Sequence, residues 1–133
     1  MSAMVLDSFA LIAYFRGEPV GVPVKELLQK ASRADRTAHM TEVNYAEVKY
    51  MILRKDGAQA WAHAAKILVA LPIEFHPADR ELADVAANFK ARFSLSLADA
   101  FAAALAKNHK AELVTGDPEF KVLEKEIKIV WLK

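Results

Sequence analysis

The sequence predicts an α/β fold, a three-layer α/β/α sandwich with a five-stranded parallel sheet. Short apolar runs bounded by turn residues alternate along the chain with segments of helical periodicity. Strands separated by helices require crossover connections, which produce a parallel sheet covered on both faces. The chain has 133 residues, 54% of them hydrophobic, and few glycines or prolines. We therefore expect a single domain over residues 1–133 with one compact core.

The first strand and the helix after it set the pattern. Met4–Leu6 is a short apolar run that ends at Asp7, and residues 9–15 then continue as the apolar face of a helix. Gly17 and Pro19 follow where a helix is expected to end. Ligands of open parallel sheets bind beyond the carboxyl ends of the strands. Asp7 is therefore expected at the mouth of the functional site.

The remaining helices and strands are predicted from the same two patterns, the apolar stripe of a helix and the short apolar run of a strand. A stripe of apolar residues predicts each helix, and short apolar or alternating runs predict the strands. Residues 43–71 form a predicted helical hairpin, in which Gly57 ends the first helix and Pro72 follows the second. The predicted helices cover residues 24–34, 43–54, 58–71, 79–92 and 98–108, with a helical turn at 119–122, and the other predicted strands cover 37–41, 73–75, 112–114 and 127–131.

Composition narrows the class of protein. The 18 basic and 17 acidic residues nearly cancel, so any contact with nucleic acid must be local. The absence of cysteine excludes disulfides and thiolate metal sites. The N-terminus lacks a secretory pattern, and the apolar runs are too short and interrupted to span a bilayer. These features predict a soluble, cytoplasmic protein that does not enter a membrane.

Four carboxylates have unusual surroundings. Asp7 and Asp117 follow the first and fourth predicted strands, so they should emerge at one edge of the sheet. Glu47 shares part of the apolar stripe of its helix. Asp99 lies in the first turn of a helix rich in alanine, where the helix dipole favours negative charge.

Four acids in one partly buried cleft repel each other unless a cation or protons neutralise them. Divalent ions that prefer oxygen ligands suit such a site. The absence of cysteine and of paired histidines favours Mg²⁺ or Mn²⁺ over zinc. Such an ion can polarise a phosphodiester and lower the pKa of water, so phosphodiester hydrolysis is the expected chemistry.

Each acid also has an ordinary structural interpretation. Asp7 and Asp117 could be turn residues, and Asp99 could simply stabilise the start of a helix. Glu47 could form an ion pair with Lys49 or Arg54. The joint pattern favours function for all four. Glu42, Glu119 and Asp84 are expected to be capping or solvated acids, with Glu42 the substitute should Glu47 have no role.

The same residues carry a resemblance. Residues 5–8, 41–48, 97–104 and 114–120 resemble, in order, the four acidic motifs of PIN-domain nucleases. The size of the chain resembles that of VapC-type ribonuclease toxins of toxin–antitoxin pairs. The resemblance implies that Asp7, Glu47, Asp99 and Asp117 are the catalytic and metal-binding acids. Ser8 and Thr115 match hydroxyl positions that support the acids in this family.

The resemblance further implies RNA cleavage that depends on Mg²⁺ or Mn²⁺, a homodimer, and inhibition by a small antitoxin protein. A catalytically silent PIN-like module for RNA binding or assembly is the alternative, although no acid is missing. A signalling receiver domain would need an aspartate where Phe75 and His76 end the third strand, and a haloacid-dehalogenase-like phosphatase would need an acid at Phe9.

Other residues have weaker assignments. The four histidines lie at no metal-ligand spacing and are expected at ordinary surface or half-buried positions: His39, His63, His76 and His109. The helix at 58–71 could contribute to a dimer contact. Six basic residues could line the cleft and hold RNA phosphates, although solvated helix faces would look the same: Arg16, Lys25, Lys49, Arg54, Lys107 and Lys110.

Overall fold

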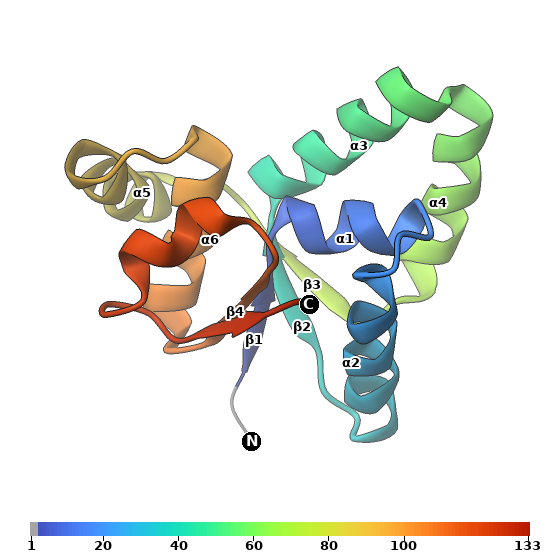
Figure 1. Ribbon diagram of the computed structural model, residues 1–133, viewed down its shortest axis with the longest axis horizontal. Helices are drawn as coiled ribbons and strands as arrows, with labels where there is room; N and C mark the ends of the chain where they lie inside the picture. The colour runs from blue at the N-terminus through green and yellow to red at the C-terminus, as the bar shows by residue number, and fades with distance from the viewer. Residues whose placement is uncertain (1–2) are drawn as a thin grey trace.

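The computed structural model describes residues 3–133, so Met1 and Ser2 of the predicted domain lie outside the described part (Figure 1). The described chain contains one five-stranded sheet of order β3-β2-β1-β4-β5, and every pairing in it is parallel. The predicted fold class is confirmed. The strands are β1 (Met4–Leu6), β2 (Ala38–Thr41), β3 (Ile73–His76), β4 (Glu112–Thr115) and β5 (Ile129–Trp131).

Helices connect the strands, as the predicted crossovers require. Most boundaries lie within a few residues of those expected from the sequence. The helices are α1 (Ser8–Phe15), α2 (Gly21–Arg33), α3 (Glu42–Asp56), α4 (Ala58–Ala70), α5 (Arg80–Arg92) and α6 (Leu97–His109), followed by the 3-10 helix η1 (Pro118–Leu123).

The sheet separates two hydrophobic clusters, which Figure 1 shows as helices on either side of the strands. On one side, Leu6 and Met40 pack with apolar residues of α1, α2, α3 and α4. On the other side, Val5 and Leu113 pack with α5, α6 and η1. Successive residues of β1 therefore point into different clusters and are both fully buried, as expected for a strand inside a parallel sheet.

The start of α2 differs from its prediction. Helix α2 begins at Gly21 rather than at residue 24, and Pro23 lies in its first turn. Proline is tolerated there because the first helical N–H groups have no partner inside the helix. Gly21 also packs so closely on α1 that an added Cβ would lie 2.5 Å from the carbonyl oxygen of Ala13. A residue without a side chain is therefore needed at this crossing.

The strand order places a topological switch point between β1 and β4. From β1 the sheet grows outward through β2 and β3 on one side, and through β4 and β5 on the other. Ligand-binding crevices of open α/β sheets form at the carboxyl ends of the strands that flank such a point. Asp7 directly follows β1, and Asp117 lies two residues beyond β4. Both acids are thus at the position where this fold class places its site.

The helices of residues 3–133 include none with the length and apolar character needed to cross a bilayer.

Candidate active site at the switch point

Asp7 lies at the centre of the site and is almost completely buried. It is the N-cap of α1, and its Oδ1 accepts a hydrogen bond from the backbone N–H of Ala10 at 2.9 Å. Its Oδ2 accepts a hydrogen bond from the Thr115 hydroxyl. Burial raises the pKa of Asp7 to about 7 despite these two donors, and the negative charges of Asp117 and Glu47 contribute to the rise.

Thr115 connects the ends of β1 and β4. Its hydroxyl donates to Asp7, and the same oxygen accepts from the backbone N–H of Asp117 at 3.0 Å. The side chain is fully buried, so both bonds form away from water. The supporting role that the resemblance implied for Thr115 therefore agrees with these contacts. Ser8, the other hydroxyl position, bonds Asn44 instead of an acid.

Asp99 faces the same place from the helix layer. It lies in the first turn of α6, which packs against β1, β2 and β4, and its N–H donates to the Ser96 hydroxyl at 3.1 Å. Burial, together with the charges of Asp117 and Asp7, raises the pKa of Asp99 to about 8. Acids that are distant in the chain are therefore close enough in space to oppose each other's ionisation.

Glu119 is the acid that sequence reasoning missed. It was expected to be a solvated bystander, and it is indeed exposed, but carboxylate oxygens of Asp99, Asp117 and Glu119 lie within 4.8 Å of one another. The turn explains this, because Asp117 Oδ1 accepts from the Glu119 N–H at 2.9 Å. The position of Glu119, two residues after the strand-end acid Asp117, was the sequence feature that could have predicted its place in the group.

These oxygens fit a hard divalent ion. Magnesium is bound octahedrally by oxygen at 2.0–2.1 Å, so two of its ligands lie about 3 Å apart when adjacent and about 4 Å apart when opposite. The carboxylate oxygens of Asp99, Asp117 and Glu119 lie within 4.8 Å of one another, close to this spacing, and the group contains only oxygen donors. A cation there would also favour the charged forms of Asp7 and Asp99, whose pKa values burial raises.

Glu47 lies at the margin of the site. It is half-buried on α3, and its charge contributes to the raised pKa of Asp7. It is not part of the close group of three acids. The ion pairs considered for it do not form among residues 3–133, since Lys49 lies over the Trp61 ring and Arg54 over the Tyr50 ring. Among the four predicted acids, Asp7, Asp99 and Asp117 are the ones brought closest together.

Asn44 is a second residue that sequence reasoning missed. It is fully buried in the first turn of α3, and its Nδ2 donates to Ser8 Oγ at 3.0 Å and to the Ala98 carbonyl at 3.1 Å. Its Oδ1 accepts from the Thr41 hydroxyl. Ser8 follows Asp7, and Ala98 precedes Asp99. Asn44 thus holds together the chain segments that carry two of the acids.

Replacing Asn44 with alanine should lower the free energy of unfolding by about 2–4 kcal/mol, because buried polar partners lose their hydrogen bonds. Urea denaturation of the metal-free protein measures this. Asn88→Ala, an exposed amide on α5, is the matched control and should change stability by less than about 0.5 kcal/mol. Equal stability of both variants would show that the network contributes nothing.

The histidines correct one expectation. His39 and His76 are half-buried while His63 and His109 are exposed, as predicted. However, the rings of His39, His76 and His109 lie together, with centroids 4.8–5.0 Å apart. Sequence spacing concealed this because the three residues come from β2, β3 and α6. The prediction that no histidines are paired was therefore wrong, although the pairing is outside the acidic site.

The basic residues are dispersed. Arg16 binds Asp56, with 2.9 Å between Nε and Oδ2, and also lies 3.8 Å from Glu18. Lys107 and Lys110 lie at the end of α6 opposite to Asp99, about 12 Å or more along the helix axis. The expectation that these two lysines border the acidic cleft was therefore wrong. An RNA-binding role for the other basic residues stays a prediction.

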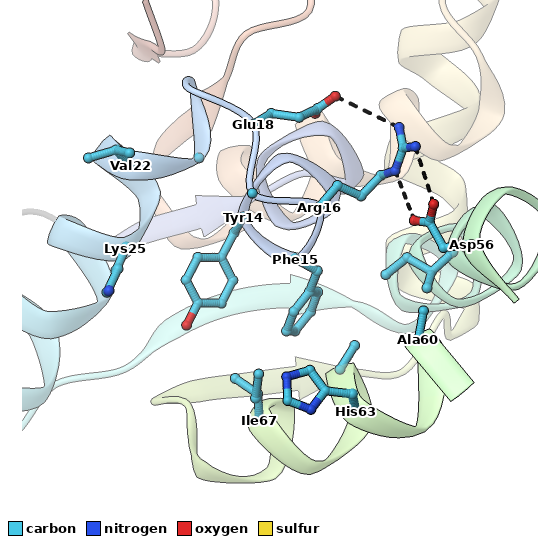
Figure 2. Close-up of a pocket in the computed structure, with 14 residues that line it drawn as sticks. Tyr14, Phe15, Arg16, Glu18, Val22, Lys25, Asp56, Ala60, His63 and Ile67 are labelled. Carbon is cyan, nitrogen blue, oxygen red and sulfur yellow. Dashed lines mark hydrogen bonds and ion pairs between the residues drawn. The ribbon is translucent and has the colours of Figure 1, made fainter. Parts of the chain in front are cut away.

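A separate pocket of about 380 Å³ lies among α1, α2, α3 and α4 (Figure 2). Figure 2 shows Phe15, Ile67 and His63 around it and the Arg16–Asp56 ion pair at its margin. Its walls are mostly apolar and include no member of the acidic group. This pocket suits an apolar side chain of a partner better than a metal ion.

The class of protein follows from the sequence match. The PIN domain family model matches residues 4–126, so the chain belongs to the PIN domain family. A comparison with curated protein sequences finds no match.

Several solved structures with the same fold come from toxin–antitoxin systems. VapBC2 from Rickettsia felis, bound to a promoter DNA fragment, has a TM-score of 0.76 at 14% identity, covering 98% of this chain and 99% of that chain. DNA-bound VapBC from Salmonella typhimurium has a TM-score of 0.75 at 13% identity, covering 100% of both chains. VapC20 from Mycobacterium tuberculosis, a toxin that cleaves the Sarcin-Ricin loop, has a TM-score of 0.68 at 16% identity over 90% of this chain and 94% of that chain.

Proposed function

We propose that the protein is a metal-dependent ribonuclease that hydrolyses phosphodiester bonds of RNA. The observation that carries the proposal is the juxtaposition of Asp7, Asp99 and Asp117 at the switch point, where burial and mutual repulsion raise the pKa values of the first two. Membership of the PIN domain family and the fold shared with VapC20 support RNA as the substrate.

In this proposal Asp99, Asp117 and Glu119 hold Mg²⁺ or Mn²⁺ from one side, and Asp7 and Glu47 complete the acidic surroundings. When bound, the ion polarises the scissile phosphodiester and lowers the pKa of the attacking water. Thr115 holds Asp7 in place through its hydroxyl, and Asn44 fixes the segments that precede Asp99 and follow Asp7.

The direct test is cleavage of a mixture of tRNA, rRNA and mRNA with mapped ends. Products should form with Mg²⁺ or Mn²⁺ and should disappear in EDTA, since the repelling carboxylates need a cation. Restoring excess Mg²⁺ should recover cleavage. Full activity in EDTA would reject the metal mechanism, and absence of cleavage with every metal and RNA would favour the silent RNA-binding module.

We further propose that the protein is the toxin of a toxin–antitoxin pair and acts in the cytoplasm, where its RNA substrate is found. The support is the shared fold with toxin–antitoxin structures from three bacteria. A small antitoxin protein is the expected inhibitor, and the apolar pocket of Figure 2 offers it a place to bind. A homodimer is the proposed assembly. Induced expression should arrest growth, and normal growth despite abundant folded protein would contradict toxicity.

A further inference from the structure

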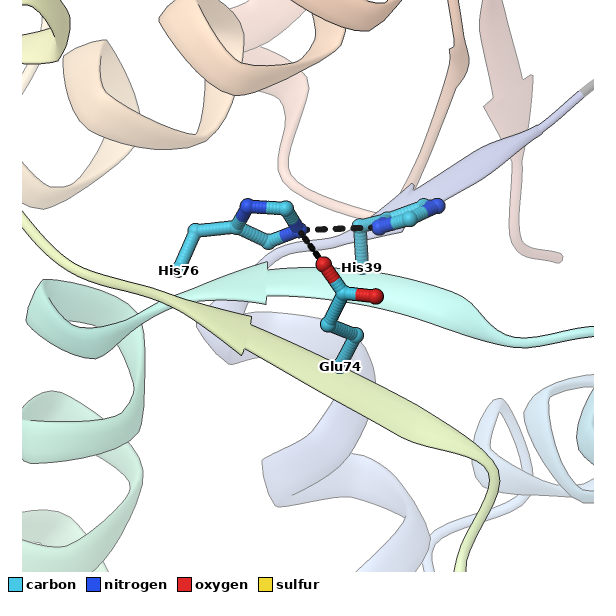
Figure 3. A group of neighbouring side chains, drawn as sticks. All are labelled: His39, Glu74 and His76. Atoms are coloured by element: carbon cyan, nitrogen blue, oxygen red, sulfur yellow. Dashed lines mark hydrogen bonds and ion pairs between the residues drawn. The ribbon is translucent and has the colours of Figure 1, made fainter.

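A second group of metal-ligating side chains lies on the sheet, away from the acids. His39 on β2 is paired in register with Glu74 on β3, and His76 follows Glu74 by two residues. Residues two apart in a strand point to the same face of the sheet. Figure 3 shows the three side chains rising from that face and converging. One ligand atom from each residue lies within 4.8 Å of the others.

The distances within the group are close to those between ligands of one ion. His39 Nδ1 lies 2.9 Å from His76 Nε2, and that nitrogen lies 3.3 Å from Glu74 Oε2. Two atoms that coordinate one tetrahedral zinc ion at 2.0–2.1 Å lie about 3.3 Å apart. Either nitrogen can donate in the His39–His76 contact, but His76 Nε2 carries one hydrogen at most and cannot donate to both of its neighbours. A cation instead interacts with the lone pairs of all three atoms at once.

The C-terminal end of α6 lies beside this group, and a hollow in the surface gives access to it. His109, the last residue of α6, places its ring 4.9 Å from that of His39 and 4.8 Å from that of His76, measured between centroids. The C-terminal end of a helix attracts cations through its dipole. A surface hollow of about 300 Å³ is lined by His76 and His109, which gives an ion a route from solvent.

We propose that His39, Glu74 and His76 form a binding site for zinc or a similar transition-metal ion, separate from the acidic site. Imidazole nitrogen selects these ions over magnesium, which prefers oxygen ligands. Three protein ligands leave one position for water or the His109 ring. Asp99 lies in the first turn of α6 and His109 is its last residue, so the two sites are about 15 Å apart along the helix axis. The bound ion links edge strand β3 to β2.

The test is zinc binding by the full chain in the presence of excess Mg²⁺. Titration calorimetry should show one zinc ion per chain, and zinc at about a hundred times its Kd should raise Tm by about 5–10 °C. Co²⁺ bound in place of zinc should give visible d–d absorption bands. His39→Ala and His76→Ala should each weaken zinc binding by more than about tenfold.

Two variants serve as controls, and a third tests the remaining ligand. His63→Ala removes an exposed histidine elsewhere and should bind zinc as the wild type does, and Asp99→Asn should as well because it alters only the acidic site. Glu74→Gln removes a charged ligand at an exposed position, so it should not disturb the core. Weakened zinc binding by this variant supports the site even if a histidine variant does not fold. The proposal is overturned if the wild type binds no zinc, if the His39, His76 and Glu74 variants bind it normally, or if Asp99→Asn alone abolishes binding. None of these outcomes depends on nuclease activity.

Discussion

Replacing Asp7 with asparagine should reduce metal-dependent RNA cleavage by at least about a hundredfold, which corresponds to about 3 kcal/mol of lost transition-state stabilisation. Asp7 is the buried centre of the acidic site, and its charge is opposed by its neighbours unless a cation is present. The amide keeps the shape of the carboxylate but supplies no negative charge. Initial cleavage rates at saturating Mg²⁺ measure the effect.

The fold should survive this substitution. An asparagine at residue 7 can accept from the Ala10 N–H with its oxygen and donate to Thr115 Oγ1 with its nitrogen, so both contacts of the site remain. Asp84→Asn, the same change at an exposed position of α5, is the matched control and should retain full activity. A folded Asp7→Asn variant that cleaves RNA at the wild-type rate would contradict the assignment of Asp7.

The metal-free protein should become less stable as pH rises from about 4 to about 8. The pKa of Asp7 is raised from 3.8 in its ordinary state to about 7, and that of Asp99 to about 8. At a pH between the ordinary pKa of an aspartate and its raised pKa in the folded chain, the folded chain holds a proton that the unfolded chain has lost. The free energy of unfolding therefore falls as pH rises through this range. Asp7 alone contributes on the order of 4 kcal/mol, at about 1.4 kcal/mol per unit.

Thermal unfolding at pH 5, 6, 7 and 8 in EDTA measures this dependence. Burial lowers the pKa of His39, so protonation of His39 in acid destabilises the folded chain and opposes the effect of the aspartates. The informative quantity is therefore the difference in stability between Asp7→Asn and the wild type. The variant should be the more stable protein at pH 8, and the difference should shrink toward pH 4. Added Mg²⁺ should stabilise the wild type more at pH 8 than at pH 5, because the ion binds ionised carboxylates. A variant that is less stable at every pH would indicate a structural role for the Asp7 charge.

Much of the fold could be predicted from the sequence because local patterns determine it. The apolar run Met4–Leu6 and the helical stripe after it are readable without tertiary information, and the parallel sheet follows from strands separated by helices. The start of α2 was harder to predict, since Gly21 and Pro23 look like loop residues until packing against α1 is known. The surroundings of Asn44 were unpredictable, because its partners Ser8 and Ala98 are far away in sequence.

The sequence by itself determined the order of strands and helices, the family, and the strand-end and helix-start positions of Asp7, Asp117 and Asp99. The tertiary structure decided which side chains meet, because contacts across a parallel sheet depend on strand order and register and not on spacing along the chain. It added Glu119 to the acids, left Glu47 at their margin, and brought His39, Glu74 and His76 together from two strands. A metal site needs its donor atoms a few ångströms apart, and only the folded chain fixes distances on that scale.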